Sequence, residues 1–175
     1  MILKFKTIQT KIKLIYLKIT GKLKKKNHLI EVGKNNTKKI KNILIIFPVM
    51  EKSFRVALYS FRSLSKSKDI NYYYIINNVY KHHFNLSGNI FNLFHNKKKV
   101  TIDETFYQER IINKDFDIII DLNDIFFYDI CYLINNMNSY YKIGLNHEYS
   151  DYFYNIQLKV DVLENCYKKI EEMIN

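Results

Sequence analysis

Polar residues that could take part in catalysis or ligand binding follow an apolar run in the segment FDIIIDLND, residues 116–124. The run is typical of a buried strand, and Asp121, Asn123 and Asp124 come where it ends. A carboxylate at the end of a buried strand can orient a sugar hydroxyl or act as a general base. Asp121 is therefore a candidate catalytic and ligand-binding residue, and Asn123 a candidate ligand-binding residue. In the alternative interpretation, Asp121 bonds to neighbouring backbone amides and Asp124 caps the next helix.

A second polar segment, PVMEKSFR at 48–55, follows another apolar run. It matches neither GxGxxG nor GxxxxGK[ST], so no motif supports a dinucleotide or P-loop site, and we expect no cofactor. Ser53 and Arg55 nevertheless lie where the N-terminus of a helix could hold an anion, which makes both candidate ligand-binding residues. In the alternative interpretation, Ser53 only caps the helix and Arg55 is solvated.

The segment GLNHEYSD, residues 144–151, adds Gly144 and His147 as candidate ligand-binding residues at a strand end. His147 could titrate near neutral pH. Neighbouring side chains point apart, so His147 and Glu148 do not make a metal site by themselves. The segment KHH at 81–83 has no further ligand at metal-binding spacing. We therefore expect no metal centre.

Strand and helix patterns alternate from residue 40 onwards. Apolar or aromatic runs predict strands, and apolar residues at helical spacing predict the segments between them to be helices. This order indicates an α/β fold: one three-layer, Rossmann-like domain over 40–175 with a mostly parallel sheet. Ligands of such folds bind at the carboxyl ends of the strands, where the candidate residues above are expected to gather. The predicted strands are 42–47, 70–77, 89–94, 116–122 and 140–145, and the predicted helices begin at Ser53, cover 103–114, begin at Asp124 and end the chain.

The basic charge belongs to an N-terminal arm, residues 1–39, which we expect to be a helix and a linker. Residues 1–42 contain thirteen lysines and one acid, whereas residues 43–175 contain fifteen Lys or Arg and sixteen Asp or Glu. This distribution argues against a nucleic acid partner, whose binding face would lie on the fold itself. The predicted helix has an apolar stripe from which Leu14 and Leu17 deviate. The stripe consists of Phe5, Ile8, Ile12, Ile15 and Ile19.

Two interpretations of the arm remain open. Residues 3–26 could rest on an anionic membrane surface, or the helix could dock on its own domain. The chain has no run of 18 apolar residues and no signal-peptide cleavage pattern, so we expect neither a spanning helix nor export. The expected location is the cytoplasm, including the inner face of the membrane. Cys131 and Cys166 occupy apolar helical positions and are expected to be buried thiols.

Four segments of the sequence together resemble the N-terminal, acceptor-side lobe of the ADP-heptose:lipopolysaccharide heptosyltransferases, a glycosyltransferase family. The resemblance covers residues 40–160. The segments are KNILIIFP, ALYSFRSLSK, FDIIIDLND and YYKIGLNHEYSDYFYN. It implies a Rossmann-like lobe, a sugar nucleotide or saccharide as ligand, and a place in lipopolysaccharide biosynthesis.

The chain departs from this family at two points. The family places a Gly-Asp pair after the first strand, and that Asp is its proposed base, whereas this chain has VMEKSFR with Glu51 as the available carboxylate. The family's second lobe, which holds most of the nucleotide-sugar site, has no counterpart in this sequence. We therefore expect a single domain without catalysis of its own that binds a sugar, a nucleotide or a protein partner in envelope glycan metabolism. The alternatives are one half of a two-chain glycosyltransferase, with Glu51 or Asp121 as base, and a membrane-surface adaptor.

Overall fold

The fold is built on one sheet, whose strands lie in the order β4-β3-β2-β1-β5-β6-β7. The structure is a computed structural model and describes residues 2–23, 25, 40–64, 69–96 and 99–174. Every pair of neighbouring strands is parallel except β3 and β4. The strands are β1 (Asn42–Ile46), β2 (Asn71–Asn77), β3 (Asn89–His95), β4 (Val100–Ile102), β5 (Phe116–Asp121), β6 (Ser139–Leu145) and β7 (Ile156–Leu158).

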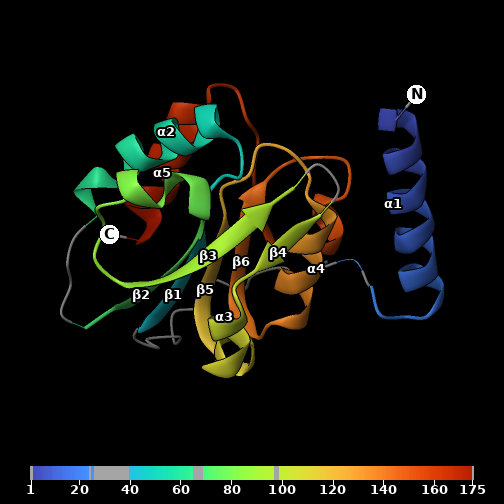
Figure 1. Cartoon of the computed structure of the whole chain (residues 1–175), viewed down its shortest axis with the longest axis horizontal. Coiled ribbons are helices and arrows are strands. Elements are labelled where there is room, and N and C mark those ends of the chain that lie inside the picture. The colour runs from blue at the N-terminus through green and yellow to red at the C-terminus, as the bar shows by residue number, and fades with distance from the viewer. Residues whose placement is uncertain (1, 24, 26–39, 65–68, 97–98, 175) are drawn as a thin grey trace, which may run out of the picture.

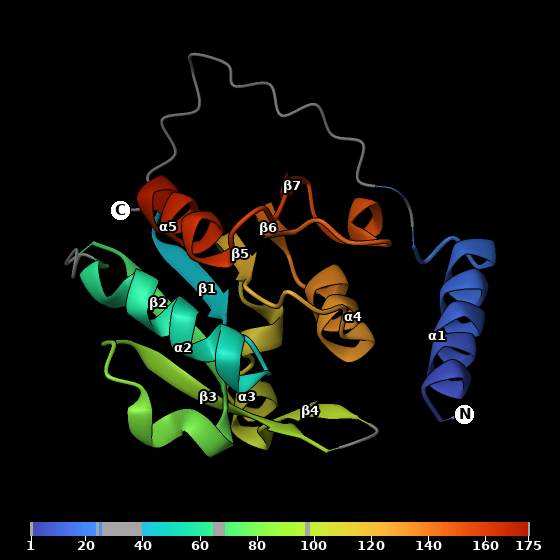
Figure 2. The same ribbon diagram turned by 90° about the horizontal axis from the view of Figure 1, so that it is seen from above.

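The central strands are apolar on both faces because helices cover both faces of the sheet. Along β1, Ile43 and Ile45 face one core, whereas Leu44 and Ile46 face the other. Helices α2 (Glu51–Ser60) and α5 (Leu163–Ile174) cover the first face, and α3 (Glu104–Gln108) and α4 (Tyr128–Asn136) cover the second (Figures 1 and 2). The predicted α/β class and three-layer arrangement are confirmed, and so are the five predicted strands, within a residue or two at their ends. Strands β4 and β7 were not predicted, because three residues are too few to show a pattern.

Two predicted helix caps are wrong. Helix α2 begins at Glu51 with Met50 as its N-cap residue, so Ser53 lies inside the first turn, where it is buried. Helix α4 begins at Tyr128, and Asp124 lies exposed in the preceding loop. The N-cap residue Phe127 has an extended backbone, and the ring of Phe126 before it packs against Tyr149 and Phe153.

The helix predicted over 103–114 is also shorter than expected. Helix α3 ends at Gln108, and Arg110 then adopts a left-handed backbone conformation with φ 55°. A non-glycine residue in this region interrupts a helix, so the chain continues as a short 3₁₀ turn over Ile111–Asn113. Asp103 caps α3, since its Oδ1 accepts a hydrogen bond from the amide of Thr105.

The N-terminal helix α1 (Ile2–Ile19) lies beside α4 at one end of the molecule (Figure 2). It packs against the second core through Leu14 and Leu17, whereas Ile12, Ile15 and Ile19 of the predicted stripe are exposed. The interpretation that the helix docks on its own domain is therefore confirmed, but with the opposite face. The predicted linker VGKNNTKK, residues 32–39, lies outside the described residues.

Candidate functional site

The strand order reverses at β1, and the site most typical of this fold lies at the carboxyl edge beside it. Strand β2 pairs with one side of β1 and β5 with the other, and Ile46 lies opposite Asp121 at the ends of β1 and β5. In open parallel sheets, ligands bind outside the carboxyl ends of the strands at this reversal. The segments that leave β1 and β5 here carry most of the residues that the sequence pattern selected.

Asp121 lies inside the protein, where every hydrogen bond of its carboxylate goes to a neighbouring residue. It is 2% exposed. Its Oδ1 accepts hydrogen bonds from the amide and the Nδ2 of Asn123 at 3.0 and 2.7 Å. Its Oδ2 accepts one from the hydroxyl of Tyr154 at 2.6 Å. This geometry supports the structural interpretation of Asp121 and gives no support to a base that reaches a ligand, although its catalytic role stays an untested prediction.

Asn123 joins the exits of β5 and β1. Its Oδ1 accepts a hydrogen bond from the amide of Val49 at 2.9 Å, and Asn77 at the end of β2 donates from its Nδ2 to the Val49 carbonyl at 3.1 Å. Both side chains are buried. Asn77 and Asn123 therefore form the floor of the carboxyl edge and fix the direction in which the chain leaves β1 for α2.

Gly144 lies directly opposite Asp121 in the neighbouring strand. A Cβ atom at Gly144 would lie only 2.6 Å from two ring atoms of Tyr154, so the glycine is needed for the tyrosine ring to lie across β6. The Tyr154 hydroxyl also lies 3.3 Å from the Sγ of Cys131, which is a free buried thiol as expected. The sequence pattern missed Tyr154, and no local signal indicates it, because it lies ten residues beyond Gly144.

His147 joins the same cluster through its ring. Its centroid lies 5.1 Å from that of Phe126 and 5.8 Å from that of Tyr154. The Nδ1 accepts a long hydrogen bond of 3.4 Å from the amide of Tyr149, so the neutral ring carries its proton on Nε2. Burial lowers the pKa of His147 below its ordinary value, which keeps the imidazole neutral at physiological pH. The structure thus brings Asp121, Asn123, Gly144 and His147 together.

The remaining candidates lie on α2. Arg55 and Glu51 are both largely exposed and form an ion pair of 2.6 Å within one turn of the helix. The N-cap residue Met50 makes no side-chain hydrogen bond to the first turn. The first amides of a helix have no partner inside it, so the start of α2 presents partial positive charge at the carboxyl edge.

Burial dominates the electrostatics of the floor. It raises the pKa of Asp121, although the hydrogen bonds from Tyr154 and Asn123 lower it in part. Burial also raises the pKa of Tyr154 and of the Cys131 thiol, and the nearby Asp121 carboxylate adds to both shifts. Neither Tyr154 nor Cys131 ionises at physiological pH, so the cluster contains no thiolate nucleophile.

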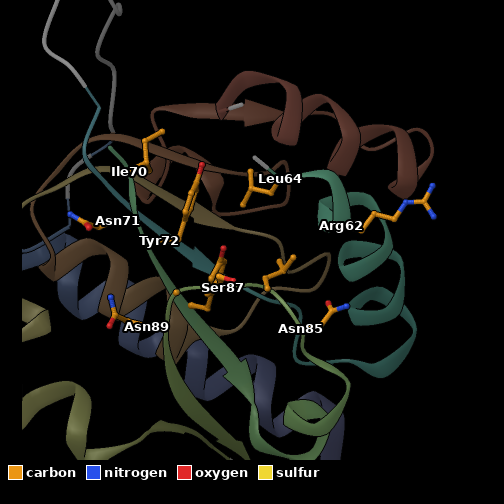
Figure 3. Close-up of a pocket in the computed structure, with 11 residues that line it drawn as sticks. Arg62, Leu64, Ile70, Asn71, Tyr72, Asn85, Ser87 and Asn89 are labelled. Carbon is orange, nitrogen blue, oxygen red and sulfur yellow. The ribbon is translucent and has the colours of Figure 1, made fainter. Parts of the chain in front are cut away.

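A separate pocket of about 440 Å³ lies at the opposite, amino edge of the sheet (Figure 3). Its wall includes Tyr72 and Tyr74, whose rings are stacked with their centroids 6.2 Å apart. The close approach of Gly88 to β2 shapes it, because a Cβ there would lie 2.6 Å from the Tyr72 carbonyl oxygen. Arg62 extends away from the other labelled residues and lies against Tyr59, with its Cζ 3.9 Å from the ring centroid. Residues 65–68, which connect two parts of the wall, lie outside the described residues, and the pocket carries no functional proposal.

The described residues contain no group of three or more His, Cys, Asp or Glu that could hold a metal ion. Among the described helices, none is both long and apolar enough to cross a membrane. A scan against models of protein families, a search of curated proteins and a search of solved structures each found no match.

Proposed function

We propose that this chain is a binding domain without catalysis of its own, and that it holds a phosphate-bearing sugar or nucleotide at the carboxyl edge beside β1. The observation that carries the proposal is the start of α2. Four residues separate the end of β1 from this helix at the strand-order reversal, and the side chain of its N-cap residue Met50 makes no hydrogen bond to the first turn. A phosphate group supplies the acceptors that these amides lack. The resemblance to the acceptor-side heptosyltransferase lobe favours a ligand from envelope glycan metabolism.

The floor of the same edge supports the part of the proposal that assigns no catalysis to the chain alone. Proton transfer needs a base within hydrogen-bond reach of the ligand, and Asp121 is buried behind Asn123 and Tyr154. Glycosyl transfer also needs donor and acceptor held together away from water. The arrangement supports binding at this edge much better than it supports turnover.

A substitution of Met50 tests the anion site without damage to the fold. Met50 has the extended backbone of an N-cap residue, with φ −87° and ψ 136°, and is partly exposed. Met50→Asp should place a carboxylate on the free amides. It should stabilise the protein by about 1 kcal/mol, as an added cap does. The same carboxylate should exclude a phosphate, so ligand affinity should fall while stability rises.

Titration calorimetry with inorganic phosphate, ADP, an ADP-sugar and a UDP-sugar gives the readout. The wild-type chain should bind at least one of the nucleotides, and Met50→Asp should weaken that binding about tenfold or more. Tyr140→Glu is the matched control, because it adds the same charge at the exposed amino end of β6. Absence of heat with all four probes, or an equal loss in both variants, would rule out the proposed site.

A second candidate function is one half of a two-chain glycosyltransferase. Glu51 favours it, since this carboxylate is exposed at the β1 exit, where the family places its proposed base. Its test needs a co-purified partner that supplies the second lobe. Glu51→Gln and Asp121→Asn should each abolish sugar transfer by the assembled pair, and transfer retained by both variants would exclude these residues as the base.

A further inference from the structure

Helix α1 carries two apolar faces, and the domain covers only one of them. Leu14 and Leu17 are 2% and 6% exposed. Ile12, Ile15 and Ile19 are 60%, 54% and 81% exposed. At about 100° per residue, these two sets lie on opposite sides of the helix. Ile12, Ile15 and Ile19, which belong to the stripe that the sequence pattern identifies, are therefore left in solvent.

Contacts from the inner side fix the rotation of the helix about its axis. The Nζ of Lys18 lies 4.1 Å from the ring centroid of Tyr152, and that of Lys13 lies 5.0 Å from the ring centroid of Tyr128. Just beyond the helix, Leu23 is buried in the same core as the two leucines. Figures 1 and 2 both show α1 at the outer side of α4, with no described element beyond it. The exposed isoleucines thus point away from the domain.

The sequence around this outer face is uniformly basic. Residues 1–30 contain nine lysines and no acid. Lys11 and Lys22 are exposed on the described part. A second copy of the chain that packed on this face would bring the same positive charge against it, which disfavours self-association. The occupant that complements the face must be anionic and must also accept apolar side chains.

We infer that the outer face of α1, formed by Ile12, Ile15, Tyr16 and Ile19, binds an anionic lipid surface. The isoleucines enter the boundary between headgroups and acyl chains, and the side chains of Lys11 and Lys22 extend to the headgroups. Because Leu14 and Leu17 hold the helix on the domain at the same time, α1 lies between the membrane and the face of the domain that α4 covers. This inference goes beyond the proposed function and does not depend on any ligand at the carboxyl edge.

Co-sedimentation of the full chain with vesicles tests the inference. One set of vesicles contains phosphatidylglycerol and phosphatidylcholine in equal parts, and the other contains phosphatidylcholine alone. The wild-type chain should sediment with the anionic vesicles, should bind the neutral ones far more weakly, and should lose affinity as salt is added.

Paired variants distinguish binding through the outer face of α1 from nonspecific binding to vesicles by exposed apolar residues. The double variant Ile15→Gln with Ile19→Gln keeps good helix formers and should weaken binding to anionic vesicles about tenfold or more. Lys11→Gln should weaken it about fivefold. Val162→Gln is the matched control, because Val162 is as exposed as Ile15, at 54%, but lies ahead of α5. It should bind like the wild type, and all variants should show wild-type thermal unfolding because the replaced side chains are exposed.

Three results overturn the inference. The first is a wild-type chain that stays in the supernatant with anionic vesicles. The second is binding that ignores lipid charge or survives the double isoleucine variant unchanged. The third is a concentration-dependent dimer in sedimentation velocity that is absent in the double variant. That result would show that the outer face binds a second copy of the chain.

Discussion

The hydroxyl of Tyr154 donates a 2.6 Å hydrogen bond to Oδ2 of Asp121, and this contact joins the end of β5 to the segment that leads into β7. The tyrosine ring crosses β6 to make it, over the position where Gly144 has no side chain. The carboxyl edge between β5 and β7 is thereby closed by a buried polar contact and not left open to a ligand.

Tyr154→Phe should destabilise the protein by about 1–3 kcal/mol, because it leaves a buried carboxylate oxygen without its donor. The Tyr154 hydrogen bond lowers the pKa of Asp121, so its loss should raise that pKa further. Urea unfolding at several pH values gives both quantities. Tyr167→Phe is the control: it removes an equally short bond to the neutral Leu122 carbonyl and should cost stability without a change in pH dependence. An equal pH dependence of the two variants would contradict the assigned role of Tyr154.

Asp121→Asn should flatten the dependence of stability on pH. Burial raises the pKa of Asp121, so the folded protein holds this proton more tightly than the unfolded chain does. The resulting stability is fully present below the unfolded pKa of about 4 and is lost as pH rises through the folded value, at up to about 1.4 kcal/mol per pH unit. The variant should lack this loss between pH 4 and the folded pKa.

The asparagine can also satisfy every bond at the site. Its Oδ1 replaces the acceptor for Asn123, and its Nδ2 can donate to the Tyr154 oxygen, whose proton can turn to the sulfur of Cys131. Near neutral pH the variant should therefore be at least as stable as the wild type. A variant with the wild-type slope between pH 4 and 7 would show that another group titrates there.

Gly144→Ala should destabilise the protein by about 1–3 kcal/mol through overpacking, since the added methyl group overlaps the Tyr154 ring. The cost should fall strongly when Tyr154 is replaced by a smaller residue, so a double-mutant cycle with Tyr154→Leu should be far from additive. Additive effects would mean that Gly144 serves some other purpose, such as access for a ligand, which the sequence pattern also allowed.

Lys142→Met should destabilise the protein by about 2 kcal/mol, although lysine is usually a surface residue. Lys142 is buried, and its Nζ donates 2.7 Å hydrogen bonds to the carbonyls of Ile134 and Met137 at the end of α4. A cation at this end complements the negative end of the helix dipole and the last carbonyl groups of the helix. Chemical denaturation measures the loss. Lys159→Met, at an exposed position, should change stability by less than about 0.5 kcal/mol.

Sequence patterns predicted the sheet well, because isoleucine-rich runs such as that of β5 must be covered on both faces. They also selected Asp121, Asn123, Gly144 and His147 as neighbours. They could not show what these residues do. The function of Gly144 depends on Tyr154, which lies ten residues on, and the burial of Asp121 depends on the same ring. Contacts of this kind come from tertiary packing, which local spacing does not encode.

The N-terminal helix illustrates the same limit. Its spacing favours the isoleucine stripe, yet two leucines outside that stripe make the contact with the domain. Periodicity reports how many apolar faces a helix has, but it cannot assign a partner to each face. Only the position of α1 beside α4 decides which face is inside.

Leu17→Gln should release α1 from the domain, because it places a polar group in the buried contact with the second core. The amides of α4 should then exchange with solvent deuterium faster, and the protein should lose about 1–2 kcal/mol of stability. Ile19→Gln is the matched control two residues further on, on the opposite side of the helix, since its side chain is 81% exposed. It should leave both quantities unchanged. Equal exchange in the two variants would show that α1 does not depend on its leucine face, and with it the orientation assigned to the exposed isoleucines would be lost.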